Sequence, residues 1–356
     1  MIRRPSSLQL ALQQVAPGTP LREGLDRIVR ARMGALLVLG DGPDVLAVCS
    51  GGFLLDAPFS PQRLSELAKM DGAIIVARDA IRIARANVHL VPDPNTPTSE
   101  TGTRHRTAER VARSINVPVI SVSEDMSVIA VYVDGVKHVI EETPRLLNRA
   151  NQAMQTLERY KARLDDASSA LTALEVEDIV TLRDVATLLQ RSEMVRRIAD
   201  EIEMYTIELG NDARLIRLQH DELMSDAEDE RSAIISDYIR DGAGWTVEEA
   251  TERLAQLPTD DVLDVRNIAA ILGHRLTGDQ LDGAITARGY RLLRQLPLIP
   301  NALADRIAAR FGNLSDVQRA SADELAATVG LDSELAEAVK GSLTRLTESS
   351  ILDRYS

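Results

Sequence analysis

The sequence predicts an α/β N-terminal domain with a mixed sheet, followed by an all-α spine and an all-α helix-hairpin-helix domain. Three observations predict this fold class. Short apolar runs alternate with helical patterns over the first 140 residues. Residues 145–240 contain a single glycine and no strand-like alternation, and two hairpin-like turns interrupt the helical patterns after residue 286. Because 356 residues exceed the size of one ordinary core, we expect domains at residues 1–143, 144–285 and 286–356.

Short apolar runs are expected to form the strands of the N-terminal sheet. They occupy residues 34–40, 45–50, 72–77, 117–123 and 127–135. Between these runs, a Ser-Pro start signal and apolar residues at helical spacing predict a helix over residues 60–70. A second helix is expected over residues 107–115, starting near Arg106 and with Thr103 or Thr107 close to its N-terminus. This alternation is typical of an α/β domain.

The middle of the chain reads as long amphipathic helices with interleaved charges over residues 145–240. Such a region often spaces domains and supports self-association, although it could also form a purely intramolecular bundle. In the tail, residues 296–300 and 328–332 are two candidate hairpins, each leading into a helix. A hairpin of this kind exposes backbone N–H groups at a helix N-terminus, where a phosphate can bind.

Composition limits the class of protein. The chain has 54 acidic and 41 basic residues and a net charge of −13, which argues against a general coat for nucleic acid. Cys49 is the only cysteine, so an intrachain disulfide is excluded and a reducing compartment is favoured. No apolar run is long enough for a membrane span, and the N-terminus does not resemble a signal peptide. We therefore expect a cytoplasmic protein that does not act in a membrane.

A positive cluster stands out in this acidic chain. Residues 102–107 read Gly-Thr-Arg-His-Arg-Thr at the expected start of a helix. Two arginines, two hydroxyls and the backbone amides of a helix N-terminus together suit a triphosphate. His105 could donate a hydrogen bond to a phosphate or ligate a metal ion beside it. The alternative is a charged helix start that faces solvent.

A second candidate element is Asp71-Gly72, at a turn before an expected strand. Because Gly72 has no Cβ, a flat ligand could lie against its backbone, and Asp71 could hold a metal ion or take a proton from a hydroxyl. The alternative is a plain turn. A proline-rich loop over residues 92–98 would frame the same site. Ser123 could point into it or could simply end a strand. The remaining histidines are scattered and form no metal set.

The stretch Asp71–Ala73, followed about thirty residues later by residues 102–110, resembles the signature pair of diadenylate cyclase domains. The likeness extends over essentially the whole chain, to the members of this family that carry a helical spine and a helix-hairpin-helix tail. It implies condensation of two ATP molecules into cyclic di-AMP with release of two pyrophosphates, and a need for Mg²⁺ or Mn²⁺. It also implies a homo-octamer in which cyclase domains face each other in pairs, so that each 3′-hydroxyl attacks the α-phosphate of the other nucleotide.

The resemblance also implies roles for individual residues. Catalysis would depend on Asp71, Arg104, His105 and Arg106, with Asp71 and His105 nearest the metal ion. ATP would further contact Gly72, Ala73, Leu90, Thr103, Thr107 and Ser123, with Gly72, Ala73 and Leu90 meeting adenine or ribose largely through backbone. The phosphates would lie on residues 103–107.

The tail departs from the family pattern. The resemblance implies binding of branched DNA with inhibition of the cyclase, and Gly330 and Lys340 are the expected DNA contacts. However, Asp332 stands where the family commonly has the second glycine of the hairpin, and residues 288–354 carry nine basic and nine acidic residues. Weak or absent DNA binding is therefore an open alternative. A second class of function also stays open, namely a DNA-binding scanning or repair protein whose nucleotide domain only senses ATP.

Overall fold

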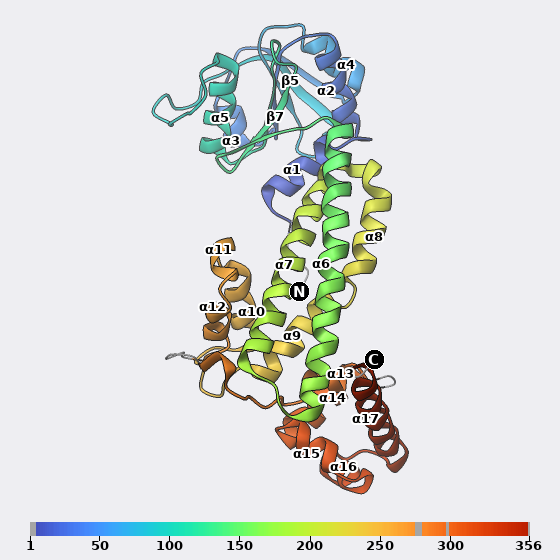
Figure 1. Ribbon diagram of the computed structural model, residues 1–356. Helices are drawn as coiled ribbons and strands as arrows, with labels where there is room; N and C mark the ends of the chain where they lie inside the picture. The colour runs from blue at the N-terminus through green and yellow to red at the C-terminus, as the bar shows by residue number, and fades with distance from the viewer. Residues whose placement is uncertain (1–4, 275–279, 297–298, 355–356) are drawn as a thin grey trace. The chain divides into compact units, whose positions relative to one another are not determined.

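The structure, a computed structural model, describes residues 5–274, 280–296 and 299–354 (Figure 1). The chain divides into two compact units. The first comprises residues 1–152 with 201–218, and the second comprises residues 153–200 with 219–356. Each unit is described by itself below. Within the described residues, every helix is too short or too polar to span a bilayer.

The first unit is built on an eight-stranded sheet among the described residues, and its strand order is β2-β5-β4-β1-β6-β7-β8 with β3 paired to β5. The strands are β1 (Ala35–Leu39), β2 (Cys49–Ser50), β3 (Phe53–Pro58), β4 (Ala73–Val76), β5 (Arg82–Leu90), β6 (Val119–Val122), β7 (Ile129–Val133) and β8 (Val136–Val139). Strands β1 and β4 run parallel, whereas every other pairing in the sheet is antiparallel. The predicted mixed α/β sheet is confirmed.

Helices cover both faces of this sheet (Figure 1). Helices α1 (Ser7–Val15), α2 (Pro20–Arg30) and α4 (Pro61–Leu67) bury Leu12, Leu25 and Leu64 against one face. Helices α3 (Pro43–Ala47) and α5 (Thr103–Ile115) bury Val45 and Val111 against the other. Local capping starts several of these helices: Ser6 and Gln9 form a capping box before α1, and the Thr19 hydroxyl accepts from the Arg22 amide at the start of α2.

Two expectations for this unit were wrong. Residues 45–50 were expected to form a strand, but residues 43–47 form α3 and only Cys49–Ser50 pair with β5. Pro43 has the fixed backbone angle that favours the first turn of a helix, and this outweighs the short apolar run. The helix expected to begin near Arg106 begins at Thr103, with Gly102 as its N-cap. The positive cluster therefore lies inside the first turn of α5.

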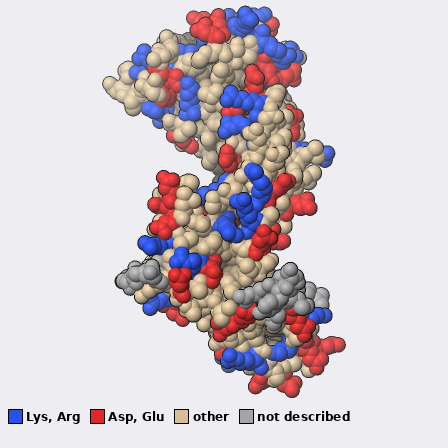
Figure 2. Space-filling view, viewed as in Figure 1, with Lys and Arg blue, Asp and Glu red and all other residues tan. Residues whose placement is uncertain are grey.

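The spine and tail are helical, as expected. The helices of these regions are α6 (Thr143–Glu177), α7 (Leu182–Leu209), η1 (Gly210–Ala213), α8 (Arg214–Met224), α9 (Ala227–Tyr238), α10 (Val247–Gln256), α11 (Thr259–Val262), α12 (Val265–Ile271), η2 (Gln280–Asp282), α13 (Tyr290–Arg294), α14 (Asn301–Phe311), α15 (Leu314–Arg319), α16 (Ala322–Val329) and α17 (Ser333–Arg354). Basic and acidic side chains are interspersed over the visible face of these helices, which agrees with the charge pattern of the sequence (Figure 2). The predicted division into three domains stays a prediction.

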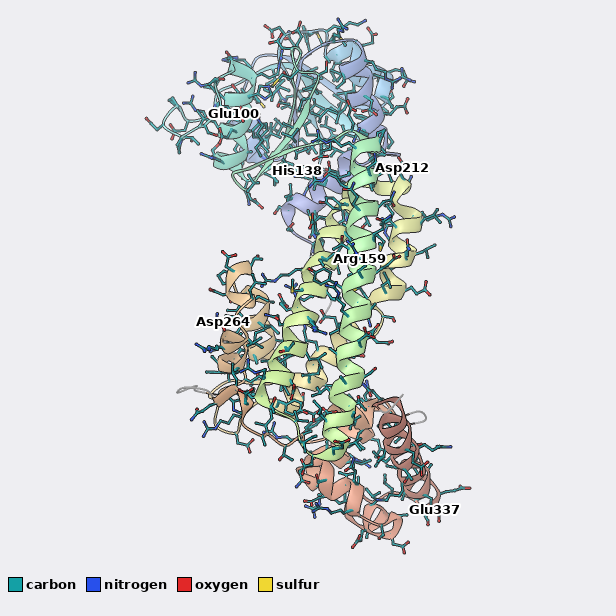
Figure 3. The ribbon with its side chains drawn as sticks, viewed as in Figure 1. Glu100, His138, Arg159, Asp212, Asp264 and Glu337 are labelled. Atoms are coloured by element: carbon teal, nitrogen blue, oxygen red, sulfur yellow. The ribbon has the colours of Figure 1, made fainter. Side chains whose placement is uncertain are left out.

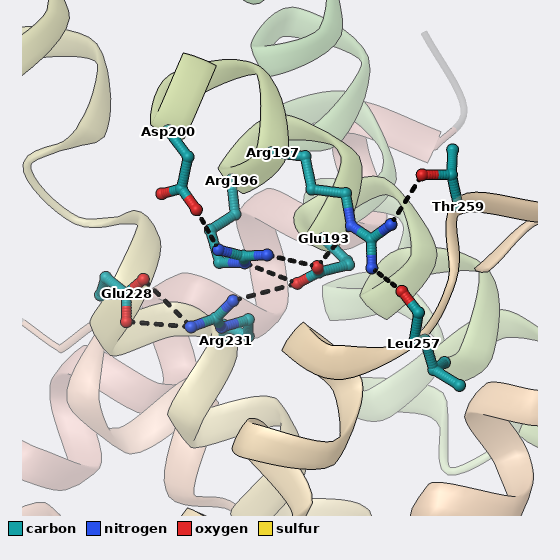
Figure 4. Close-up of polar contacts among 8 residues, drawn as sticks. All are labelled: Glu193, Arg196, Arg197, Asp200, Glu228, Arg231, Leu257 and Thr259. Carbon is teal, nitrogen blue, oxygen red and sulfur yellow. Dashed lines mark hydrogen bonds and ion pairs between the residues drawn. The ribbon is translucent and has the colours of Figure 1, made fainter. Parts of the chain in front are cut away.

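A buried polar cluster joins helices of the second unit (Figure 4). Glu193 is fully buried on α7 and accepts hydrogen bonds from three arginines. Arg196 Nη2 lies 2.6 Å and Arg197 Nε 2.7 Å from Glu193 Oε1, and Arg231 Nη1 of α9 lies 3.2 Å from Oε2. Arg197 also donates to the Leu257 carbonyl oxygen over 2.5 Å. This single carboxylate thus ties α7 to α9 and to the loop before α11.

A second buried network fastens the start of the tail to the spine. Arg291 of α13 is 1% exposed, and its Nη2 lies 2.5 Å from Glu175 Oε2 of α6. The Tyr238 hydroxyl of α9 donates to the other Glu175 oxygen over 2.7 Å. Asp237 accepts the backbone N–H groups of residues 289–291 over 2.6, 2.6 and 2.8 Å. The orphan donors at the N-terminus of α13 are thereby satisfied inside the unit.

The tail contains short helices around their own core, consistent with the expected helix-hairpin-helix units. Of the first candidate hairpin, residues 297–298 lie outside the described residues; α14 begins directly after Pro300. In the second, Gly330 adopts a left-handed conformation with φ of 72° at the end of α16. Asp332 then accepts the backbone N–H of Leu335 over 2.7 Å. The aspartate that departs from the family pattern therefore caps α17.

Candidate functional site

The residues predicted to form the site meet at one edge of the sheet in the first unit. Because β1 and β4 are parallel, their N-terminal ends lie together, with Leu36 opposite Ala73. The antiparallel partners β5 and β6 end at the same edge, where Val88 pairs with Ala73 and Val122 pairs with Ala35. Sheet order therefore gathers Gly34, Asp71, Leu90 and Ser123 from four strand ends.

Helix α5 begins at this same edge. A Cβ on Gly34 would lie 2.0 Å from Arg104 Nη1, so the guanidinium rests directly on the start of β1. His105 Nδ1 lies 2.8 Å from Ser121 Oγ of β6. No side chain among the described residues caps α5 at Gly102. Uncapped N–H groups and the helix dipole therefore coincide with the basic side chains, an arrangement that favours an anion.

Asp71 and Gly72 enter this edge just before β4, and both are exposed. Gly72 has a φ of 151°, and a Cβ there would lie 2.8 Å from the Cα and carbonyl carbon of Asn87 on β5. The glycine is thus required by the close approach of two backbones. The position that a Cβ would take is filled by β5, while the backbone of Gly72 is exposed beside the exposed Asp71.

The other predicted ATP contacts are in different environments. Ala73 and Leu90 bury their side chains in the core under α5, so their contact with a nucleotide through backbone stays a prediction. Thr107 donates its hydroxyl proton to the Thr103 carbonyl oxygen over 3.0 Å. Ser123 is buried and its Oγ accepts the Met126 N–H over 3.3 Å, which supports the turn after β6. Thr103 and Arg106 are exposed at the first turn of α5.

His105 has partners that sequence reasoning missed. The Tyr132 oxygen of β7 lies 3.0 Å from His105 Nδ1. Glu100, labelled in Figure 3 in the loop before α5, accepts the Tyr132 hydroxyl proton and pairs with Lys137 of β8. Burial lowers the pKa of His105; the charges of Lys137 and Arg104 add to this effect, while Glu100 opposes it. Burial raises the pKa of the Tyr132 hydroxyl, and Glu100 adds to the rise. A neutral imidazole beside a protonated phenol is therefore favoured near neutral pH.

The proline-rich loop is fastened to α5. The buried carboxylate of Glu109 accepts the Thr98 hydroxyl over 2.5 Å and the Ser99 N–H over 2.9 Å. Burial opposes ionisation of Glu109, but these hydrogen bonds and the charge of Arg113 outweigh it and lower its pKa. Arg110 donates to the Thr96 carbonyl oxygen over 3.0 Å. These contacts hold the loop to α5 beyond its first turn, at Glu109 and Arg110.

The donor set suits a hard divalent cation that a triphosphate helps to hold. Among the described residues, no three His, Cys, Asp or Glu side chains form a cluster that could hold a metal ion. Asp71 offers one carboxylate, and a neutral His105 offers one ring nitrogen. Mg²⁺ in nucleotide sites is commonly bound by one or two carboxylates with phosphate oxygens as the other ligands. The residues therefore fit a cation that arrives with its nucleotide.

Of the predicted DNA contacts, Gly330 lies in the hairpin between α16 and α17, and Lys340 lies within α17. Gly330 ends α16, and Lys340 donates its Nζ to the Gln318 carbonyl oxygen. Burial lowers the pKa of Lys340. Its ammonium is thus used to join α17 to α15, and Asp332 already occupies an N–H at the start of α17. Both observations weigh against a phosphate contact at this hairpin.

A cavity of about 1,200 Å³ lies at the opposite edge of the sheet, near the C-terminal ends of β1 and β4. Leu39, Ala77 and Arg82 line it, and none of the predicted site residues does. Arg82 is paired there with Asp41 and Asp56. The chemistry-bearing residues therefore lie at the other edge, where Asp71, Thr103 and Arg106 are exposed.

Comparison with known proteins agrees with this arrangement. Residues 22–137 match the family described as DisA bacterial checkpoint controller nucleotide-binding, and residues 140–281 match the DisA bacterial checkpoint controller linker region. The chain is 50% identical over 351 residues to the DNA integrity scanning protein DisA of Acidothermus cellulolyticus, covering 98% of this chain and 95% of that one. It is 52% identical over 346 residues to the protein of the same name from Frankia alni, covering 97% and 96%. The resemblance seen in the sequence is confirmed, and the chain belongs to the family of the DNA integrity scanning protein DisA.

Proposed function

We propose that the chain is a diadenylate cyclase that condenses two ATP molecules into cyclic di-AMP and releases two pyrophosphates. One observation carries this proposal: the Asp71 carboxylate and the arginine-bearing, uncapped N-terminus of α5 lie at the same edge of one sheet. Membership in a family with a nucleotide-binding region over residues 22–137 supports it. A ligand with both a hydroxyl to deprotonate and a polyphosphate to hold fits this pair of features.

The chemistry follows from these groups. The N–H groups of α5 with Arg104 and Arg106 hold the triphosphate, and Asp71 takes the proton from the 3′-hydroxyl. The 3′-oxygen bonds to the α-phosphorus of the second nucleotide while the bond from that phosphorus to pyrophosphate breaks. A second such step closes the ring, so two bonds form and two pyrophosphates leave. Mg²⁺ or Mn²⁺, held by Asp71, His105 and phosphate oxygens, would neutralise charge on the leaving group.

The exposure of the site supports a reaction between two copies of the chain. Asp71, Thr103 and Arg106 all lie at the surface of the first unit. A phosphoryl transfer that excludes water needs this surface to be covered. A second copy that presents the same edge would cover it and would bring the second ATP. We propose that such pairs form within the expected homo-octamer.

Gly34→Ala is expected to lower the rate of cyclic di-AMP formation about 100-fold, because a methyl group there displaces the Arg104 guanidinium from its seat on β1. The side chain can move, so the thermal midpoint should stay close to that of wild type. The matched control is Gly42→Ala, whose φ is −67° and whose added Cβ meets no described atom within 4 Å. The measurement is the initial rate of cyclic di-AMP formation by both variants. Equal rates would show that the position of the Arg104 guanidinium against Gly34 does not affect the reaction.

The test of the function is incubation of the purified chain with ATP and either metal ion, followed by identification of the product by mass spectrometry. Cyclic di-AMP and pyrophosphate in a 1:2 ratio are expected. If 3′-deoxy-ATP with Mg²⁺ raises the thermal midpoint but ATP yields no product with either ion, the chain is an ATP sensor and the cyclase proposal fails. A nucleotide present at 100 times its dissociation constant should stabilise the fold by about 2.7 kcal/mol.

Binding of branched DNA by the tail stays a prediction, as does its inhibition of the cyclase. Over the described residues, the contacts of Asp332 and Lys340 weigh against the second hairpin as a phosphate site. The visible face of the tail carries both acidic and basic side chains (Figure 2). A cytoplasmic location likewise stays a prediction.

A further inference from the structure

A chain of hydrogen bonds runs from Lys137 into the core of the first unit and ends on His105. Lys137 Nζ lies 2.7 Å from Glu100 Oε1, and the Tyr132 hydroxyl donates to the same oxygen over 3.2 Å. The Tyr132 oxygen lies 3.0 Å and Ser121 Oγ 2.8 Å from His105 Nδ1. Tyr132 and Ser121 are 1% and 0% exposed, so the inner contacts around His105 are shielded from water, whereas Lys137 at the outer end is exposed. Hydrogen bonds in such surroundings are strong and hold their geometry.

Lys137 and Glu100, at the outer end of this series of hydrogen bonds, limit the directions in which its protons can be donated. A lysine ammonium only donates hydrogen bonds, and an ionised carboxylate only accepts them. The Tyr132 hydroxyl donates to Glu100, so its oxygen can accept the Nδ1 proton of His105, and the Ser121 hydroxyl oxygen can accept the same proton. An imidazole protonated at Nδ1 carries its free lone pair on Nε2, and none of the hydrogen bonds described above involves Nε2. These contacts fit the form of His105 that accepts or ligates through Nε2, and a Ser121 hydroxyl turned to donate to Nδ1 would fit the other form.

The contact between Glu100 and Tyr132 is not needed to hold the loop. Glu109 binds Thr98 and Ser99, Arg110 binds the Thr96 carbonyl oxygen, and Arg113 binds the Pro97 carbonyl oxygen over 2.8 Å. These contacts fasten the loop to α5 without Tyr132. The connection from Glu100 to His105 therefore has a separate consequence, which is the orientation of the imidazole.

We propose that Glu100, Tyr132 and Lys137 are positioning residues that hold His105 as the Nδ1–H tautomer, with Nε2 open to the metal–triphosphate. They act through His105 and do not touch the substrate. The consequence for the reaction rests on the proposed cyclase function, whereas the tautomer is a property of the nucleotide-free protein. Carboxylates placed behind histidines in this way orient them, and their loss typically costs about 10–100-fold in activity or metal affinity.

The kinetic test is Tyr132→Phe, which keeps the buried ring and removes only the hydroxyl. We expect kcat for cyclic di-AMP to fall about 10–100-fold while KM for ATP changes little, because the phosphates keep their arginines. Glu100→Ala should lower kcat by a similar factor. Glu100→Gln keeps an acceptor oxygen and should retain most of the wild-type kcat. The control is Arg113→Met, which loosens the loop and should leave kcat near that of wild type. Equal kcat in Tyr132→Phe and wild type would overturn the proposal.

The second readout is the tautomer of His105 itself. Selective ¹⁵N labelling of the five histidines, with assignment by His105→Gln, reports which ring nitrogen carries the proton. Nδ1–H is expected in wild type, with partial transfer to Nε2–H in Tyr132→Phe. If the variant keeps the wild-type tautomer, and kcat falls only in step with thermal stability, the contact is structural and the proposal fails. If wild type makes no product but the tautomer shifts as expected, the cyclase proposal fails while the positioning stands.

Discussion

Asp71→Asn is expected to lower the rate of cyclic di-AMP formation by about 10²–10⁴-fold and to leave the fold intact. Asparagine has the same shape, but its amide neither takes a proton from the 3′-hydroxyl nor replaces a carboxylate at a divalent cation. Asp71 is exposed just before β4, so no buried contact depends on its charge. Initial rates with ATP and Mg²⁺ or Mn²⁺ measure the effect, and binding of 3′-deoxy-ATP measures whether the site still forms.

The matched control for this change is Asp79→Asn. Asp79 is also exposed and lines the cavity at the opposite edge of the same sheet, where its Oδ1 accepts the Ile81 N–H over 3.0 Å. An asparagine oxygen can accept the same bond, so the control should keep the wild-type rate. A wild-type rate in Asp71→Asn with both metal ions would mean that Asp71 is only a turn residue, the alternative that the sequence left open.

Arg291→Met is expected to destabilise the second unit by about 3–5 kcal/mol. The substitution leaves the Glu175 carboxylate buried without its guanidinium partner, which in the native protein lies 2.5 Å away. It also removes donors to the hydroxyls of Ser168 and Thr172. Trp245, the only tryptophan, lies in the second unit, so its fluorescence during urea unfolding follows this unit.

Two further variants test whether the loss of stability comes from the unpaired Glu175 carboxylate or from the loss of any arginine ion pair. Adding Glu175→Gln to Arg291→Met removes the unpaired charge, keeps an acceptor for the Tyr238 hydroxyl and should restore most of the lost stability. Arg183→Met breaks an exposed pair with Asp282 and should leave the urea midpoint of unfolding close to that of wild type. If the urea midpoint of unfolding of Arg291→Met equals that of wild type, this network does not stabilise the second unit.

The strands that could be predicted from the sequence are those with unbroken apolar runs. Strands β1, β4, β6 and β7 are buried along their whole length, so nearly every residue in them is apolar. Strand β5 was missed because Arg85, Asn87 and His89 alternate with small buried residues and hide the apolar face. The run at residues 45–50 misled for the opposite reason: its apolar residues belong to a short helix set by Pro43.

The candidate site could be predicted in part. The cluster on α5 was found because consecutive basic or protonatable side chains are unusual in an acidic chain. Asp71-Gly72 alone could also have been a plain turn, and its resemblance to the diadenylate cyclase signature made it a candidate. The packing of the Arg104 guanidinium against Gly34 was not predictable, since it depends on which strand lies beneath the helix. Tyr132 was hidden within an apolar run, where a tyrosine reads as core. The cap formed by Asp332 did have a local signal, an aspartate directly before a helix, but we interpreted that residue as a lost glycine in the turn and as repulsion toward phosphate.

Co-expression of differently tagged wild-type and Asp71→Asn copies gives the most direct test of a reaction shared by two sites. If each of the two bonds needs its own Asp71, a mixed pair joins the nucleotides once and cannot close the ring. The output of cyclic di-AMP per wild-type copy should then fall in proportion to the wild-type fraction, while the linear intermediate accumulates. An output per wild-type copy that stays constant at every mixing ratio would contradict catalysis by paired sites.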